Sequence, residues 1–165
     1  MKLEALTLRD AQRLREWRNE DISVFRTPYL LTEKMQEDFY YSLNRNSKMR
    51  YWAIKKNDIT IGVGGLVNIE WENRLAEISL VVVPECRGRS YSNKVVDLIL
   101  HEGFNNMNLV NIYGECYECN PSINFWKNLC SKYNATYTIL PNRKYWNGQY
   151  WNSFYFNFER GLFNA

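Results

Sequence analysis

The sequence predicts an α/β (α+β) fold, in which a mixed and mostly antiparallel central sheet is flanked by helices. Segments with apolar residues at every second position alternate with segments of helical spacing, in the order β-α-α-β-β-β-α-β-α-β-β. A strand, a helix and a second strand follow one another between residues 75 and 117, which implies one parallel pair joined by a crossover. Asn147-Gly148 predicts a hairpin near the end.

The first half of the chain is expected to hold one strand, two helices and three meandering strands. Thr7-Leu8-Arg9-Asp10 has the form of a capping box, and residues with helical spacing follow it. Asn57-Asp58 and Glu72-Asn73-Arg74 mark turns between strands. The expected elements are strand 2–8, helix 8–19, a helix that begins at Thr32, and strands 49–55, 59–69 and 75–83.

The second half is expected to alternate helices with strands and to end in a hairpin. Pro121 suits the first turn of a helix, because the amide hydrogen that proline lacks would be unpaired there. The hairpin turns around Trp146-Asn147-Gly148-Gln149. The expected elements are helix 92–107, strand 109–117, helix 121–132, and hairpin strands 135–145 and 150–159.

Length and composition indicate a single globular domain over residues 1–165. The chain is 45% hydrophobic and 16% aromatic, enough to bury a sizeable core. It has neither an apolar run long enough to span a membrane nor a signal-peptide core at its start, so we expect a cytoplasmic protein without a membrane partner. The net charge of +3 does not require a nucleic-acid partner, although a local basic patch leaves that alternative open.

Cysteine spacing raises the question of a metal or redox site. Cys116-Tyr117-Glu118-Cys119 has the C-x-x-C spacing of such sites. It falls at the end of an expected strand, however, where residues three apart point to opposite faces, and the one histidine, His101, lies on another element. We therefore interpret the cysteines as buried thiols and expect no metal.

The most informative segment runs from the apolar strand at 76–83 through a short basic loop into a helix. Such an arrangement directs several backbone N–H groups and a helix N-terminus at one spot, which suits an anion such as phosphate. Arg87 and Arg89 add positive charge there. The alternative is an ordinary turn in which a serine caps the helix.

Arg87-Gly88-Arg89-Ser90-Tyr91-Ser92 resembles the acyl-CoA pyrophosphate loop of the GNAT N-acetyltransferase superfamily, whose pattern is Arg/Gln-x-x-Gly-x-Gly/Ala. Both positions that are usually small hold serine, which reaches positive φ less readily than glycine. The order of elements is also that of the GNAT fold. The ribosomal-protein and amino-sugar branches carry similar residues at these points: Trp17-Arg18-Asn19, Ile61-Gly62, Ala76-Glu77-Ile78 and Asn120-Pro121-Ser122.

The resemblance implies acetyl-CoA as co-substrate, with its pantetheine arm between strands 77–83 and 109–117. Its diphosphate would lie on the loop, and a backbone N–H near Val82 would polarise the thioester carbonyl. Asn120 and Ser122 match pantetheine-contacting positions, with simple N-capping as the alternative. The implied cofactor-binding residues are Val81, Val82, Val83, Arg87, Gly88, Arg89, Ser90, Tyr91, Ser92, Asn120 and Ser122.

The resemblance also implies that Glu77 is the catalytic base. A carboxylate beside the thioester can take the proton that an amine must lose before it attacks. The alternative is a solvent-facing or ion-paired glutamate; Glu70, Glu72 and Asp38 are lesser candidates for the base. Trp126 stands where many members of the superfamily carry a tyrosine as general acid, and an indole cannot serve as one. Tyr117, Tyr133 or water remain as alternatives for the acid.

In this superfamily the acceptor site is lined by the connection between the first two helices and by the terminal hairpin. Arg26, Tyr29 and Arg143 are our candidates for acceptor contact. The aromatic residues of the hairpin could stack on a base or a sugar. For most of them we favour the alternative, in which Trp151, Phe154, Phe156 and Phe158 fill the core or a homodimer contact.

The expected function is therefore acetyl-CoA-dependent N-acetylation of a primary amine on a small molecule, such as an amino sugar or a sugar nucleotide. One alternative is acetylation of protein N-termini. Another is a nucleic-acid-binding or nucleic-acid-modifying protein on the same scaffold, which the two serines, the missing tyrosine and the aromatic and basic hairpin at 143–151 would suit.

Overall fold

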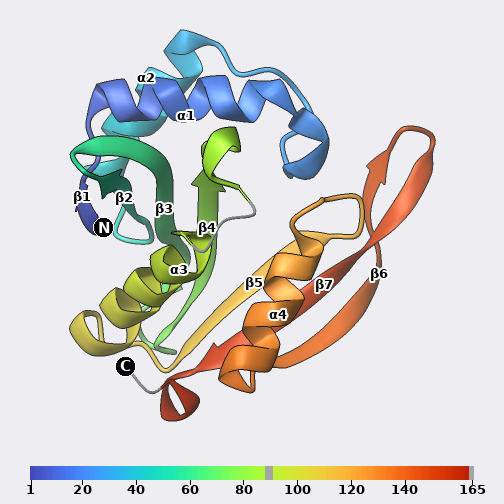
Figure 1. Cartoon of the computed structure of the whole chain (residues 1–165). Helices are drawn as coiled ribbons and strands as arrows, with labels where there is room; N and C mark the ends of the chain where they lie inside the picture. The colour runs from blue at the N-terminus through green and yellow to red at the C-terminus, as the bar shows by residue number, and fades with distance from the viewer. Residues whose placement is uncertain (88–90, 164–165) are drawn as a thin grey trace.

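The computed structural model describes residues 1–87 and 91–163, which form a seven-stranded sheet with helices on both faces (Figure 1). The strand order is β1-β2-β3-β4-β5-β7-β6; β4 and β5 are parallel, and all other neighbours are antiparallel. The predicted fold class and order of elements are confirmed. The elements are β1 (Lys2–Ala5), α1 (Leu8–Glu20), α2 (Glu33–Leu43), β2 (Arg50–Lys56), β3 (Ile59–Glu70), β4 (Leu75–Val82), α3 (Tyr91–His101), β5 (Asn111–Tyr117), α4 (Ile123–Tyr133), β6 (Thr136–Trp146) and β7 (Gln149–Glu159).

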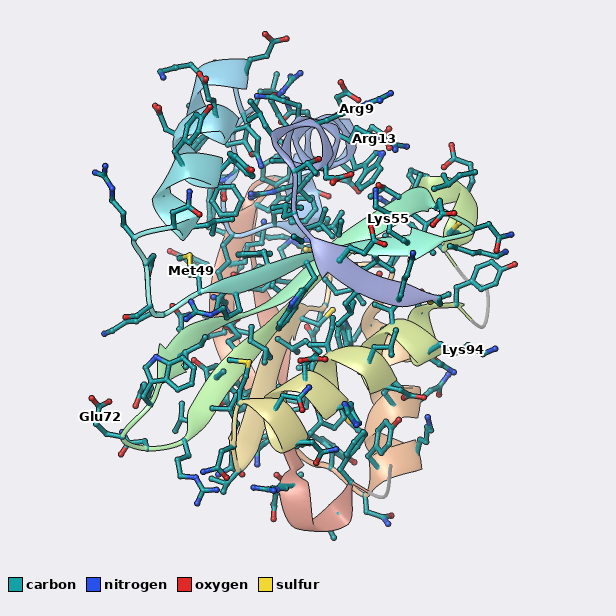
Figure 2. All side chains as sticks on the ribbon, turned by 90° about the vertical axis from the view of Figure 1, so that its left-hand side faces the viewer. Arg9, Arg13, Met49, Lys55, Glu72 and Lys94 are labelled. Carbon is teal, nitrogen blue, oxygen red and sulfur yellow. The ribbon has the colours of Figure 1, made fainter. Side chains whose placement is uncertain are left out.

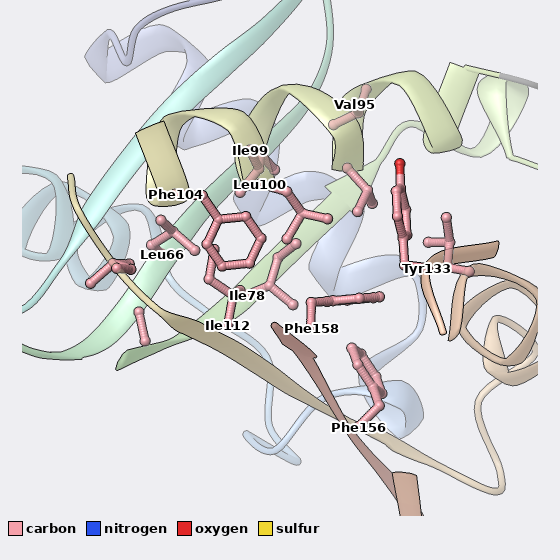
Figure 3. Packing of buried hydrophobic residues seen from close by; sticks show 14 of the residues in the cluster. Leu66, Ile78, Val95, Ile99, Leu100, Phe104, Ile112, Tyr133, Phe156 and Phe158 are labelled. Atoms are coloured by element: carbon pink, nitrogen blue, oxygen red, sulfur yellow. The ribbon is translucent and has the colours of Figure 1, made fainter. Parts of the chain in front are cut away.

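Successive side chains of β3 point to opposite faces of the sheet and so contribute to two separate cores. Val63 packs with Leu14 and Trp17 of α1 on one face of the sheet. The neighbouring Gly64 faces the other side, where a Cβ atom would lie 2.6 Å from Ile99 of α3. The larger core lies on this second face, beneath α3 and α4 (Figure 3).

Aromatic residues of β7 fill the second face of the sheet. Phe154, Phe156 and Phe158 are each 1% exposed and belong to the larger core. Trp151, by contrast, is half-buried. The interpretation of the phenylalanines as core residues is confirmed, so they do not form a homodimer contact.

The predicted capping box begins α1. The Thr7 side chain accepts from the Asp10 amide, and the Asp10 carboxylate accepts from the Thr7 amide at 3.1 Å. Asp10 also accepts a hydrogen bond from the Thr60 hydroxyl at 2.6 Å and lies 3.6 Å from Lys55. The cap thus fastens α1 to β2 and β3, and Figure 2 shows Lys55 on the sheet beneath α1.

Several predicted boundaries were wrong by a few residues. The first strand ends at Ala5 because Thr7 leaves the sheet to cap α1. The third helix becomes a π-helix over Glu102–Asn106, and β5 begins only at Asn111. The hairpin turn is the two residues Asn147 and Gly148, whose φ values are 51° and 80°, as the tight turn requires. None of the described helices is both long and apolar enough to cross a bilayer.

Candidate active site

A gap opens in the sheet where β4 and β5 diverge. The two strands pair only from Leu75 to Glu77 on β4 and from Asn111 to Tyr113 on β5. Beyond that point β4 continues to Val82 and β5 to Tyr117, and Figure 1 shows them running apart. The backbone of each strand therefore has polar groups that its neighbour does not pair, which is a surface suited to an extended ligand.

Strand pairing decides which amide of the valine run faces the gap. The Val83 N–H donates to the Ile61 carbonyl of β3 at 2.9 Å. Because successive residues of a strand direct their backbone groups to opposite sides, the Val82 amide points towards the gap, and the Val81 amide points towards β3. The Arg87 side chain donates to the Val82 carbonyl at 3.0 Å. Val82 and Arg87, both predicted cofactor residues, thus meet at the edge of the gap.

Part of the predicted diphosphate loop, Gly88, Arg89 and Ser90, lies outside the described residues. Tyr91 begins α3, and its ring lies 3.8 Å from the Lys56 ammonium of β2; Ser92 is buried in the same turn.

Two further cations lie at the start of α3. They are Lys56, which contacts Tyr91, and Lys94 in the first turn of α3, which Figure 2 shows projecting outward. Sequence analysis missed both, because neither belongs to the motif.

Asn120 and Ser122 hold the turn before α4. The side-chain oxygen of Asn120 accepts a hydrogen bond from the Ser122 amide at 2.8 Å, whereas the Ser122 side chain makes no capping hydrogen bond. The local capping group is therefore Asn120 and not the serine.

Glu77 is buried at the start of the gap, on the face of the sheet that carries α1. Its side chain is 9% exposed. Arg26, from the connection between α1 and α2, donates to both carboxylate oxygens, at 3.1 and 2.5 Å. Asn68 donates to one of them at 2.8 Å. Glu77 is thus an ion-paired glutamate, the alternative that the sequence left open.

A second buried carboxylate, Glu115, shares Arg26 with Glu77. Glu115 on β5 is 3.0 Å from Arg26 and accepts from Arg143 at 2.8 Å and from Ser153 at 2.7 Å. Burial alone would raise the pKa of Glu115, but the hydrogen bonds from Arg143 and Ser153 and the charge of Arg26 lower it below its usual range. Sequence analysis missed Glu115; its one signal is a charge inside an otherwise apolar strand.

The predicted acceptor residues are only partly brought together. Arg26 and Arg143 meet on Glu115. Burial lowers the pKa of Arg26, but its bond to Glu77 and the charges of Glu77 and Glu115 raise it well above the usual value, so the guanidinium stays charged. Tyr29 lies exposed further along the α1–α2 connection, outside this set of contacts.

The family follows from comparison with known proteins. A family model described as "Acetyltransferase (GNAT) domain" matches residues 1–124. The chain belongs to the GNAT acetyltransferase family. Members of this family take an acyl group from acetyl-CoA, and the gap between β4 and β5 lies where the resemblance to the family places the pantetheine arm of that co-substrate.

Its similar relatives include spermidine acetyltransferases of Vibrio cholerae. The spermidine N(1)-acetyltransferase of that organism is 26% identical over 111 residues, which are 67% of this chain and 64% of that protein. The match therefore spans less than two thirds of the relative.

Solved structures of that organism's spermidine N-acetyltransferase share the fold. One, in complex with CoA and spermine, has a TM-score of 0.86 at 21% identity and covers 98% of this chain and 96% of that one. A dodecameric structure in an intermediate state has a TM-score of 0.82 at 20% identity and covers 97% and 94%.

Trp126 of α4, which the sequence aligns with the usual GNAT tyrosine, stacks on Phe156 with ring centroids 4.8 Å apart and packs against the larger core. Tyr133 bonds to Asp97 and Lys132 between α3 and α4. Tyr117, at the end of β5, shares its face with Glu115. Burial raises the pKa of Tyr117 above its usual value, and the charge and hydrogen bond of Arg26 oppose that shift.

Two of the buried cysteines are protonated, and two basic residues of the hairpin are engaged by neighbouring groups. Burial raises the pKa of Cys116 to about 12 and that of Cys130 to about 11, which keeps both thiols protonated. No group of three metal-binding side chains occurs among residues 1–87 and 91–163. Arg143 is held by Glu115, and the buried Lys144 donates to the Phe25 carbonyl, so neither cation projects freely from the hairpin.

Proposed function

We propose that this protein transfers the acetyl group of acetyl-CoA to the primary amine of a small cationic acceptor. The observation that carries the proposal is the divergence of β4 and β5 directly after Glu77. The Val82 amide lies at one end of the diverging stretch of β4, and the buried Glu77 carboxylate lies at the other end.

The Val82 amide is assigned to the thioester carbonyl. A fixed N–H that points at the oxygen stabilises the negative charge that develops when the amine attacks, and it needs no reorganisation to do so. The Val81 and Val83 backbones flank it. Arg87, the following loop residues, Tyr91 and Ser92 are assigned to the diphosphate, at the N-terminus of α3.

Glu77 is assigned to remove the proton of the attacking amine, directly or through water. An alkylamine arrives as an ammonium ion, so one proton must leave before nitrogen can form the new C–N bond. Arg26 holds Glu77 from a connecting segment, and its side chain is 51% exposed. An incoming ammonium ion therefore competes with a displaceable guanidinium for the same carboxylate.

The departing thiolate of CoA takes up a proton from Tyr117 or from water. Tyr117 is the better placed of the two tyrosines that the sequence offered, because Tyr133 is engaged between α3 and α4. Since a thiolate is a fair leaving group, a dedicated acid is not essential to the reaction.

Charge favours a polyamine such as spermidine as the acceptor. Two buried carboxylates, Glu77 and Glu115, lie on this part of the sheet, and Glu70 lies in a hollow beside Tyr113. Carboxylates attract a polycation. The spermidine acetyltransferases among the relatives support the same class. An amino sugar is the second candidate, because the stacked rings of Tyr113 and Tyr155 offer a flat surface for a sugar ring.

An acceptor panel tests the proposal. The protein is incubated with acetyl-CoA and spermidine, spermine, a monoamine, glucosamine or an amino-sugar nucleotide, and the release of free thiol is followed. We expect turnover with the polyamines, slower turnover with glucosamine and none with the nucleotide. Absence of thiol release with every acceptor would overturn the proposed activity, and preference for the nucleotide would overturn the acceptor class.

A further inference from the structure

A hollow of about 510 Å³ lies beside Glu77. It is found where the pairing of β4 and β5 begins, at Leu75 and Asn111, on the side of Glu77 away from the gap. It extends over the outer face of β7. Its lining combines two aromatic rings, two amides, one carboxylate and one aliphatic side chain: Tyr113, Tyr155, Asn111, Asn157, Glu70 and Leu75.

The hollow adjoins the catalytic carboxylate directly. Tyr113 is the register partner of Glu77 in the β4–β5 pair, so the two side chains stand next to each other on one face. Tyr113 stacks on Tyr155 with ring centroids 5.6 Å apart and planes 25° apart. Gap, Glu77 and hollow therefore follow one another along β4.

Polar groups of the hollow are already oriented. Asn157 donates to Asn111 at 3.0 Å, which leaves the Asn111 amide nitrogen and the Asn157 carbonyl oxygen directed elsewhere. Asn73 donates to the Glu70 carboxylate at 2.7 Å and fixes that side chain at the rim. The carboxylate has further lone pairs with which to accept hydrogen bonds from an ammonium group.

The potential in the hollow is negative. Burial raises the pKa of Tyr113, and the negative charges of Glu77 and Glu70 raise it further, against the lowering effect of Arg26. Burial and the charges of Glu77 and Glu115 likewise raise the pKa of Tyr155. The faces of tyrosine rings also attract cations.

We propose that this hollow binds the distal ammonium group of a linear polyamine whose terminal amine is acetylated beside Glu77. The inference rests on the proposed function and adds to it the place where the rest of the acceptor lies. Glu70 takes the distal charge, and Tyr113 and Tyr155 cover the intervening methylene chain.

The spacing along β4 sets the length of the acceptor. Glu77, the proposed base, and Leu75, where the hollow begins, are two residues apart on β4. At ~3.3 Å per strand residue, the base and the hollow are separated by roughly 7 Å. A chain with a second amine several carbons away spans that distance, whereas a short monoamine does not reach the hollow.

The decisive variant is Glu70→Gln, which keeps the size of the side chain and removes its charge. The matched control is Glu72→Gln, since Glu72 lies two residues away and outside the hollow lining, and Figure 2 shows it pointing away from the sheet. For each protein, kcat/KM is measured with spermidine and with butylamine, and spermidine binding to the CoA-loaded protein is measured by calorimetry.

We expect Glu70→Gln to lower the ratio of the spermidine and butylamine kcat/KM values by roughly fivefold, the scale of one exposed charge pair, mainly through the KM for spermidine. Glu72→Gln leaves that ratio unchanged. An unchanged ratio in Glu70→Gln, or an equal fall in both variants, would overturn the subsite.

Failure of the subsite and failure of the proposed function give different results. Turnover of butylamine and spermidine at equal kcat/KM by the unmodified protein contradicts the subsite alone. If no amine is acetylated, the proposed function fails, and calorimetry still decides the subsite: saturable spermidine binding that Glu70→Gln weakens supports it, and absence of binding overturns it.

Discussion

Two buried carboxylates that share one arginine define the chemistry of this protein at the scale of residues. Glu77 and Glu115 come from neighbouring strands, and Arg26 bridges them from a connecting segment. A buried carboxylate without a partner would be costly, so Arg26 supplies both carboxylates with a cation. In the proposed reaction, the acceptor ammonium replaces that cation at Glu77.

Removing the charge of Glu77 tests its role as the base. We expect Glu77→Gln to lower kcat by about 10²- to 10⁴-fold, the usual contribution of a positioned base, with little change in the dissociation constant of acetyl-CoA. Steady-state kinetics and calorimetric titration measure the two quantities. Glu118→Gln, at an exposed position on the turn after β5, is the control. Unchanged kcat in Glu77→Gln would assign the proton transfer to another group.

The resemblance to the family named three of the charged residues that meet here: Glu77, Arg26 and Arg143. Their roles stay predictions. Glu115 was missed although it too interrupts an apolar strand, because the family motif does not include that position. Lys56 was missed because its approach to Tyr91 joins residues 35 positions apart, which spacing along one element cannot indicate.

At the scale of elements, the backbones of the paired strands β2 and β3 approach each other closely. A Cβ atom at Gly65 would lie 2.3 Å from the Arg50 carbonyl oxygen. Since that oxygen belongs to the paired strand, it cannot move aside as a flexible side chain would. The sheet that carries Asn68 and Glu77 therefore depends on glycine at this position.

Gly65→Ala is expected to destabilise the protein by about 1–3 kcal/mol, because the strands must separate to admit the methyl group. Gly161→Ala is the control, since a Cβ atom there has nothing within 4 Å. Chemical denaturation measures both free energies of unfolding. Equal stability of the two variants would show that the strand pair accepts the methyl group without separating.

The cap of α1 makes stability depend on pH. Burial alone would raise the pKa of Asp10, but hydrogen bonds from Thr60 and Thr7 and the charge of Lys55 lower it below its usual value. A carboxyl group with a lowered pKa in the folded state stabilises the protein above its unfolded pKa of about 3.9, and this contribution is lost as the pH falls through the folded value.

Asp10→Asn is therefore expected to cost about 1–2 kcal/mol at pH 7 and progressively less below pH ~4. Denaturation at a series of pH values measures the difference from the unmodified protein. Asp58→Asn is the control, because the Asp58 side chain is 88% exposed and pairs with the exposed Lys2. A cost for Asp10→Asn that is the same at pH 7 and pH 3 would contradict the assignment.

The order of elements was predictable from the sequence, and their ends were less so. Period-two and helical patterns indicate each strand and helix, and Asn147-Gly148 sets the hairpin turn. Boundaries shifted where a tertiary contact decides them: Thr7 leaves β1 in order to cap α1, and the π-turn after His101 places the buried Phe104 in the core.

The whole molecule is organised around the place where two strands part. On one side of the gap lies the start of α3, which we assign to the diphosphate; on the other lie Glu77 and the hollow, which we assign to the acceptor (Figure 1). The sequence predicted the gap only through the resemblance to the family. The sequence did not predict the hollow, because the lining residues come from four separate strands.

Titration with acetyl-CoA tests the central claim most directly. Calorimetry is performed with acetyl-CoA and CoA, and the melting temperature is recorded at each ligand concentration. A ligand that binds only the folded state raises the melting temperature as it saturates the protein. The account predicts saturable binding of one acetyl-CoA per chain and a rising melting temperature. Titrations that show neither saturation nor a shift in melting temperature with either ligand would contradict it.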